Sequence, residues 1–250
     1  MTANFYDELA PYYHLLYGDW DSAISSQGAA LGALFIAQGV PLEGPVLDAA
    51  CGIGTQTIGL LRQGFRVIAS DISPGAIDRL KTELARQTLE ADAYVDDLRT
   101  LAQVAPGSMA AVIACDNSLP HLLSDDQILQ SLRSCYRCLR PNGIVLISVR
   151  DYAELERKNP DVRPYGLRRD ANGNRFVAVQ AWEWDGDQYD LRMYLTTESA
   201  DGACKTLVVR SRYYAVSIAR LRHLMVEAGF VNVERHDDVF FQPILMGRRK

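Results

Sequence analysis

Short apolar runs alternate with amphipathic stretches between residues 46 and 149, and this is the strongest pattern in the chain. The apolar runs, which we expect to form buried strands, are 46–50, 65–70, 94–95, 109–115 and 144–149. Between them, apolar residues recur at helical spacing, and Ser73 followed by Pro74 has the pattern of a helix N-cap. Strands that alternate with helices predict a Rossmann-like, doubly wound and mostly parallel sheet.

The segments on either side of this core have different patterns. The first 40 or so residues are predicted to be helical and to form a lid, whereas longer strands of antiparallel character are expected later in the chain. These strands are predicted at 175–180, 189–197 and 207–214, followed by a helix at 217–228 and a hairpin. We therefore expect one structural domain in three parts: a helical lid (1–42), a core (43–152), and an antiparallel extension (153–250) that completes the sheet and an acceptor pocket.

Composition and charge narrow the classes of partner. The chain has 250 residues, of which 48% are hydrophobic and 23% charged, and 26 Lys and Arg against 31 Asp and Glu give a net charge of −5. Nucleic acids and anionic membranes both attract basic surfaces, so neither is an expected partner. No apolar run approaches the ~20 residues of a membrane span, and the polar residues 1–8 are unlike a signal peptide.

The cysteines indicate a reduced, cytoplasmic protein. There are five, which is an odd number, and they are scattered along the chain. Cys135 and Cys138 form a Cys-x-x-Cys pair within a stretch of helical spacing, and further zinc ligands are not apparent nearby. Helix packing is therefore favoured over metal or redox chemistry, and no metal is expected.

The segment Asp48-Ala-Ala-Cys-Gly-Ile-Gly-Thr55 lies between a predicted strand and a predicted helix. Its two glycines let a ligand approach the backbone, and the following helix N-terminus offers unpaired N–H groups. Asp71 ends the next strand, 17 residues after Gly54, where such folds place an acid that binds ribose hydroxyls. Thr57 stands where the third glycine of a dinucleotide site would be, and Asp48 would repel a pyrophosphate but suits an ammonium group. An NAD-dependent oxidoreductase is therefore disfavoured.

These residues resemble motif I of the class I S-adenosylmethionine (SAM) methyltransferases. Three further segments resemble that family's motifs in the same order: 71–74, 96–98 and 139–143 with the strand that follows. The resemblance implies SAM as the cofactor, bound along the carboxyl edge of the sheet. The residues implied in cofactor binding are Asp48, Ala50, Gly52 and Gly54 for the amino-acid part, Asp71 for the ribose, Ile72, Asp97 and Leu98 for the adenine, and Asn117 for the methionine side.

Shorter segments resemble small-molecule N-methyltransferases. Residues 5–13 resemble the N-terminal entry of small-molecule methyltransferases, and residues 115–122, 150–152 and 209–214 are similar to parts of glycine and sarcosine N-methyltransferases. Enzymes that methylate ring nitrogens of toxoflavin-type azapteridines share these features. Asp116 stands where the glycine enzymes carry glycine. The resemblance implies methylation of a small-molecule nitrogen, with an azapteridine-like heterocycle favoured and glycine or sarcosine as the alternative. A SAM-binding protein without catalytic activity is a further alternative.

Candidate acceptor and catalytic residues follow from position. His121 and Asp116 are the candidate catalytic residues, although His121 is at least as well explained by packing against the cofactor. Arg150 is a candidate carboxylate clamp or, equally, half of a surface ion pair. Aromatic side chains in the lid and the extension are candidates for stacking on the acceptor, although most aromatics in strands are core residues. The aromatic candidates are Tyr13, Tyr17, Trp20, Trp182 and Tyr213.

Overall fold

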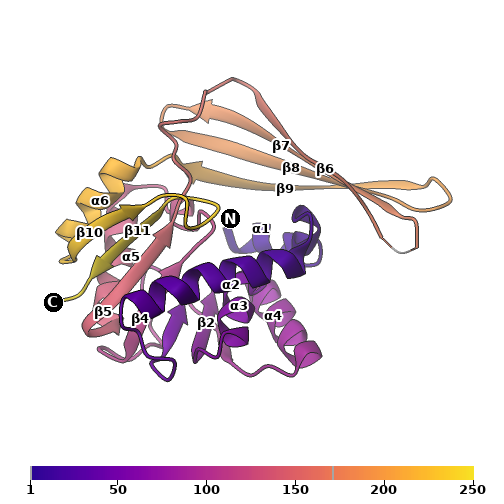
Figure 1. Ribbon diagram of the computed structural model, residues 1–250. Coiled ribbons are helices and arrows are strands. Elements are labelled where there is room, and N and C mark those ends of the chain that lie inside the picture. Colours follow the sequence, from indigo (N-terminus) through magenta and orange to yellow (C-terminus); the bar gives the residue numbers. More distant parts are fainter. Residues whose placement is uncertain (1, 171) are drawn as a thin grey trace.

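A seven-stranded sheet forms the centre of the computed structural model, which describes residues 2–170 and 172–250 (Figure 1). The strand order is β10-β11-β5-β4-β1-β2-β3, and β11 runs antiparallel to both of its neighbours while the other pairs are parallel. The strands are β1 (Val46–Asp48), β2 (Val67–Asp71), β3 (Asp92–Val95), β4 (Met109–Ala114), β5 (Leu139–Ser148), β10 (Val231–His236) and β11 (Ile244–Arg248). Strands β1 and β4 are fully buried, as expected for parallel strands covered on both faces.

Helices flank the strands of the main sheet, and serine side chains begin three of them. The helices of the core are α3 (Thr55–Arg62), α4 (Pro74–Gln87), α5 (Asp125–Cys138) and α6 (Ile218–Glu227), with a short 3-10 helix, η2, at Leu119–His121. The hydroxyls of Ser73, Ser124 and Ser217 accept N–H hydrogen bonds from the first turns of α4, α5 and α6. No helix in the described part of the chain combines the length and hydrophobicity of a membrane span.

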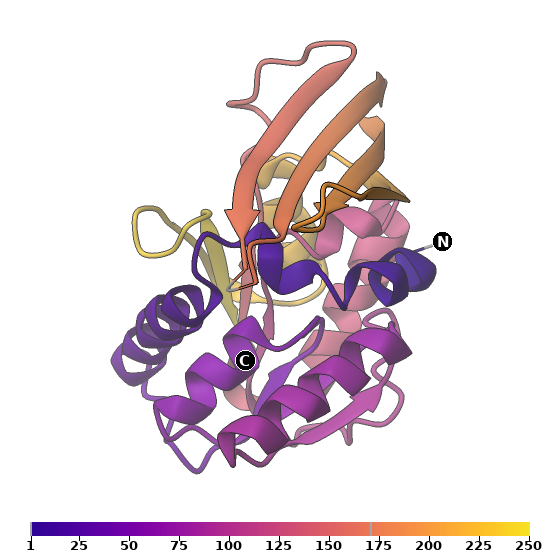
Figure 2. The ribbon, with the colours of Figure 1, turned by 90° about the vertical axis from the view of Figure 1, so that its right-hand side faces the viewer.

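The N-terminal segment is helical, as predicted. It consists of α1 (Thr2–Leu9), η1 (Tyr13–Leu16) and α2 (Trp20–Ala37). Helix α1 contacts both α4 of the core and β9 of a second sheet, so it lies between the two sheets of the molecule (Figure 2). Helix α2 packs on α3.

The second sheet has four antiparallel strands and lies over one edge of the core (Figures 1 and 2). Its strands are β6 (Asp161–Arg169), β7 (Arg175–Asp185), β8 (Gln188–Glu198) and β9 (Cys204–Tyr214), in sequential order. Along β8 the residues alternate between buried and partly exposed, so one face covers the core and the other faces outward.

The predicted fold class is confirmed, with three corrections of detail. The sheet is mostly parallel and carries N-terminal helices and an antiparallel extension, but only β10 and β11 of that extension join the main sheet. Strand β6 was not predicted, because its exposed and charged positions hide the alternation that marks a strand. Strand β5 begins at Leu139 rather than at residue 144, since the predicted turn is absorbed as a register shift with Asn142 at φ 63°.

Candidate active site

The glycine turn after β1 brings main chain to the surface of a cavity. Gly52 and Gly54 have φ values of 53° and 95°, a left-handed region that disfavours any other residue. At Gly54 a Cβ atom would also lie 2.3 Å from Cδ1 of Leu80. The turn is therefore specified both by its conformation and by the packing of α4 against it.

The carboxylate of Asp71 holds this turn in place. Oδ2 accepts a hydrogen bond from the N–H of Gly52 and Oδ1 accepts one from the N–H of Ser73, each at 2.9 Å. Burial raises the pKa of Asp71, although these backbone hydrogen bonds oppose the shift. One side chain thus connects the glycine turn after β1 to the loop after β2.

Asp48 is buried below the turn with one oxygen unpaired. Its Oδ2 accepts a hydrogen bond of 2.7 Å from Oγ1 of Thr57, which explains why threonine occupies the position of the third glycine. Its Oδ1 has no hydrogen-bond partner among the described residues, and burial raises the pKa of this carboxyl to about 7. A carboxyl buried directly beneath the turn makes this end of the cavity suited to a positively charged group and unsuited to a phosphate.

The first cavity has a volume of about 330 Å³ and lies along the carboxyl edge of the sheet. Six of the predicted cofactor residues line it: Ala50, Gly52, Asp71, Ile72, Asp97 and Leu98. Asp48 and Gly54 belong to the turn beside it. The backbone and the acidic side chains predicted from three separate loops are therefore brought together around one space.

Asp97 is held by a neighbour that the sequence did not indicate. Arg99 donates from Nε to both carboxylate oxygens at 3.0 Å and from a terminal nitrogen at 2.6 Å. Burial alone would raise the pKa of Asp97, but the hydrogen bonds and charge of Arg99 outweigh it and lower that pKa. Asp97 is thus ionised and oriented at the cavity wall.

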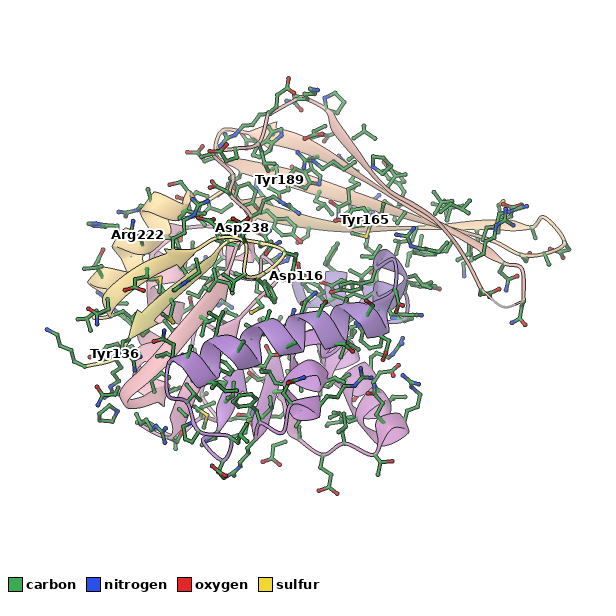
Figure 3. All side chains as sticks on the ribbon, viewed as in Figure 1. Asp116, Tyr136, Tyr165, Tyr189, Arg222 and Asp238 are labelled. Atoms are coloured by element: carbon green, nitrogen blue, oxygen red, sulfur yellow. The ribbon has the colours of Figure 1, made fainter. Side chains whose placement is uncertain are left out.

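A second cavity, of about 540 Å³, lies between the core and the four-stranded sheet. Figure 3 shows Asp116 below that sheet, which carries Tyr165 and Tyr189. The two cavities share four lining residues: Tyr6, Tyr13, Tyr17 and Asp116. Asn117, predicted on the cofactor side, lines the second cavity instead and donates a 2.8 Å hydrogen bond to the hydroxyl of Tyr152.

Asp116 occupies the junction of the two cavities in a left-handed conformation, with φ 54°. Its Oδ2 accepts hydrogen bonds from the hydroxyls of Tyr13 and Tyr17, each at 3.3 Å. Burial raises the pKa of this carboxyl, while the charge of Arg150 and the two tyrosine hydroxyls oppose the rise. The candidate catalytic carboxylate therefore stands where the two cavities meet.

His121 also lines the first cavity, but both of its ring nitrogens are engaged. Nε2 lies 2.8 Å from the hydroxyl of Tyr6, and Nδ1 lies 3.2 Å from Oγ of Ser211. Burial lowers the pKa of His121 to about 3, so the ring is neutral at physiological pH. This arrangement favours the packing role over that of a general base.

The predicted acceptor residues divide into two groups. Tyr13, Tyr17, Arg150 and Tyr213 line the second cavity. Trp182 is fully buried behind the cavity wall: it stacks 4.3 Å from the ring of Tyr189, and the guanidinium of Arg150 lies 4.9 Å from its own ring. Trp20 lies outside both cavities.

Three tyrosines of the cavity walls, Tyr6, Tyr165 and Tyr189, were not among the predicted site residues. Residues of β6 and β8 reach the cavity only because the four-stranded sheet folds over the core. Tyr6 lies within the segment 5–13 that resembles N-methyltransferases, which is the one sequence signal that points to it.

Sequence comparison shows that the chain is similar to methyltransferases. Residues 46–143 match the family described as "Methyltransferase domain". A putative methyltransferase, YqeM, of Bacillus subtilis is 28% identical over 64% of this chain and 58% of its own length. A glycine/sarcosine N-methyltransferase of Parasynechococcus marenigrum is 30% identical over 55% of this chain and 48% of its own length. The chain thus spans about half the length of the curated relatives it matches.

Solved structures agree with this fold over nearly the whole chain. DesVI of Streptomyces venezuelae has a TM-score of 0.82 at 16% identity and covers 97% of this chain and 98% of its own. SAM-bound CalS10, an amino pentose methyltransferase from Micromonospora echinaspora, has a TM-score of 0.73 at 15% identity, covering 91% and 92%. The structure therefore has a methyltransferase fold. The match of residues 46–143 to a methyltransferase domain agrees with the predicted class of SAM-dependent methyltransferases.

Proposed function

We propose that the chain is a SAM-dependent methyltransferase that methylates a nitrogen of a small molecule. The observation that carries this proposal is the junction at Asp116, where a cavity lined by the glycine turn meets a second, larger cavity. A transfer reaction needs two adjoining spaces that bring the reacting atoms together, since proximity and orientation supply much of the rate of a displacement.

The residues of the first cavity fit SAM. The main chain of Ala50, Gly52 and Gly54 would hold the amino-acid part, and the carboxyl of Asp48, buried beneath the turn, would favour the ammonium group of this part through its charge. Asp71 would accept from the ribose hydroxyls, and Asp97 with the N–H of Leu98 would hold the adenine edge. When bound, SAM supplies an activated methyl group on a positively charged sulfur.

Two observations bear on the acceptor. The cavity of about 540 Å³ is much larger than glycine requires, and its tyrosine walls suit the predicted azapteridine-like heterocycle. Arg150, on the other hand, forms no ion pair with any described residue, and such a guanidinium suits the carboxylate of glycine or sarcosine. Amines such as the sugar implied by the name of the amino pentose methyltransferase are a third group of candidates.

The test is mass-spectrometric detection of a labelled methyl group after incubation with labelled SAM. The acceptor panel contains glycine, sarcosine, an amino pentose and unmethylated azapteridines. Transfer that is lost in Asp71→Ala supports the proposal. SAM that binds with its methyl group retained across the panel would instead support the alternative of a non-catalytic SAM-binding protein.

A further inference from the structure

We infer that Asp116 makes the enzyme selective for an acceptor that arrives as a protonated aliphatic amine, and that its free oxygen takes the proton released before methyl transfer. This inference rests on the proposed function and specifies its substrate class. It is carried by the hydrogen bonding of Asp116 and by the distribution of charge around the second cavity.

The two oxygens of Asp116 differ. Oδ2 accepts both tyrosine hydrogen bonds, whereas Oδ1 accepts none from any described residue. Oδ1 of Asp48 is unpaired and fully buried. Oδ1 of Asp116 is also unpaired but is not fully buried, so it is open to the cavity. The protein thus satisfies one oxygen and leaves the other available at the junction.

A directional chain of hydrogen bonds fixes this orientation. The indole N–H of Trp20 donates to Oγ1 of Thr55 at 2.8 Å, and that hydroxyl donates to the oxygen of Tyr17 at 3.3 Å. The oxygen of Tyr17 therefore accepts a hydrogen bond from Thr55, and its own O–H donates one to Asp116. Each link donates toward Asp116, which stabilises a charged acceptor at the end of the chain.

Among the carboxylates that line the second cavity, Asp116 is the one without an ion-pair partner in the described part of the chain. The other carboxylate of the cavity wall, Asp151, is paired with Arg235 at 2.8 Å. The other titratable groups near Asp116 are the Cys115 thiol, whose pKa is raised by burial, together with neutral tyrosines and one cation. The tyrosines and the cation are Tyr6, Tyr13 and Tyr17 from the N-terminal segment, Arg150 after β5, and Tyr165 from β6.

The protonation state of the acceptor nitrogen explains why a carboxylate at this position favours an amine. An aliphatic ammonium has a pKa of about 10, so it reaches the site without a free lone pair and must lose a proton to a base. A neutral ring nitrogen already presents its lone pair and needs no base. In the proposed step the proton moves from nitrogen to Oδ1, the freed lone pair forms the N–CH₃ bond, and the electrons of the S–CH₃ bond remain on sulfur.

The test compares wild type with Asp116→Asn on an amino pentose, sarcosine and an unmethylated azapteridine between pH 6.5 and 9.5. For the amine acceptors, we expect the variant's kcat/KM at pH 7 to fall by about 10²–10⁴-fold, the usual contribution of a positioned base. That loss should shrink by about tenfold per pH unit as the free amine accumulates, which a merely structural role would not produce. Asp190→Asn, on the outward positions of β8, serves as the carboxylate control and should leave the pH profile unchanged.

Two outcomes overturn the inference while leaving the proposed function intact. One is transfer to the azapteridine alone. The other is transfer to an amine that Asp116→Asn reduces equally at every pH or not at all. Absence of transfer to any acceptor overturns the proposed function itself, and the inference with it. Calorimetric SAM affinity and the melting temperature of Asp116→Asn show whether the variant retains the fold and the cofactor site.

Discussion

The hydroxyl of Tyr6, on the first helix, lies 2.8 Å from Nε2 of His121, at the end of η2. On its other side His121 meets Ser211 of β9, and its ring lies 4.1 Å from that of Tyr213. A single neutral imidazole therefore joins the N-terminal segment, the core and the four-stranded sheet. This position explains why a histidine near the site has a structural role even though it faces the cofactor cavity.

His121 should make the fold sensitive to acid. The unfolded chain binds a proton near pH 6.5, whereas the buried ring resists it until about pH 3, so stability is lost as the pH falls. Between pH 7 and pH 5 this difference amounts to about 2 kcal/mol of unfolding free energy. Urea unfolding at the two pH values should show this loss in wild type and a smaller one in His121→Gln.

The carboxyls with raised pKa, such as Asp48 and Asp116, act in the opposite direction because the folded state binds their protons first. They are present in both proteins, so the comparison isolates the histidine. An equal loss of stability in wild type and His121→Gln would contradict the buried, neutral ring.

Asp71→Ala should weaken SAM binding by about 100-fold, because it removes two charge-assisted hydrogen bonds worth ~1.5 kcal/mol each. It also releases the N–H groups of Gly52 and Ser73 that the carboxylate holds. Calorimetric titration with SAM measures the change, and Asp78→Ala, an exposed acid on α4, is the matched control. Native melting behaviour combined with unchanged SAM affinity would refute the ribose role of Asp71.

Within the predicted lid (1–42), the segment 4–20 is connected to the loop after β2 by Asp7. Oδ1 of Asp7 accepts hydrogen bonds from Oγ of Ser73 at 2.6 Å and from the N–H of Gly75 at 2.8 Å. We expect SAM to protect this segment from limited proteolysis, and Asp7→Ala to accelerate cleavage, whereas exposed Glu8→Ala should not. Equal cleavage rates with and without SAM would show that the segment does not close over the cofactor.

The sequence predicts site residues that depend on local chain geometry better than it predicts those that depend on packing between distant segments. Gly52 and Asp71 were predicted to act together because the glycine turn and the acid that ends the next strand follow a local rule of such folds, and the family resemblance implied the role of Asp97. Tyr165 and Trp182 could not be placed in this way. Their roles depend on how a separate sheet folds over the core, and the alternation along a strand does not say which face covers a cavity.

Another feature hidden from the sequence is the contact between Gly28 of α2 and Gly59 of α3, which brings two helix backbones together. A Cβ atom on Gly28 would lie 2.5 Å from the main-chain carbon and oxygen of Gly59. Gly28→Ala should therefore destabilise the fold by about 3 kcal/mol or more, because backbone cannot move aside as a side chain can. The denaturation midpoint in urea measures this loss.

Gly32→Ala, one turn further along α2, separates packing from helix propensity. Its Cβ would meet only side chains, the ring of Phe65 at 3.3 Å and Cγ of Gln63 at 3.5 Å, and alanine favours a helix over glycine by about 1 kcal/mol. We expect its stability to remain within about 1 kcal/mol of wild type.

Similar losses of stability in Gly28→Ala and Gly32→Ala would show that the Gly28–Gly59 contact has no special role. A loss confined to Gly28→Ala would establish the close approach of α2 and α3. Because Trp20 and Thr55 lie at the N-termini of these two helices, that approach also sets the spacing of the hydrogen-bond chain that ends at Asp116.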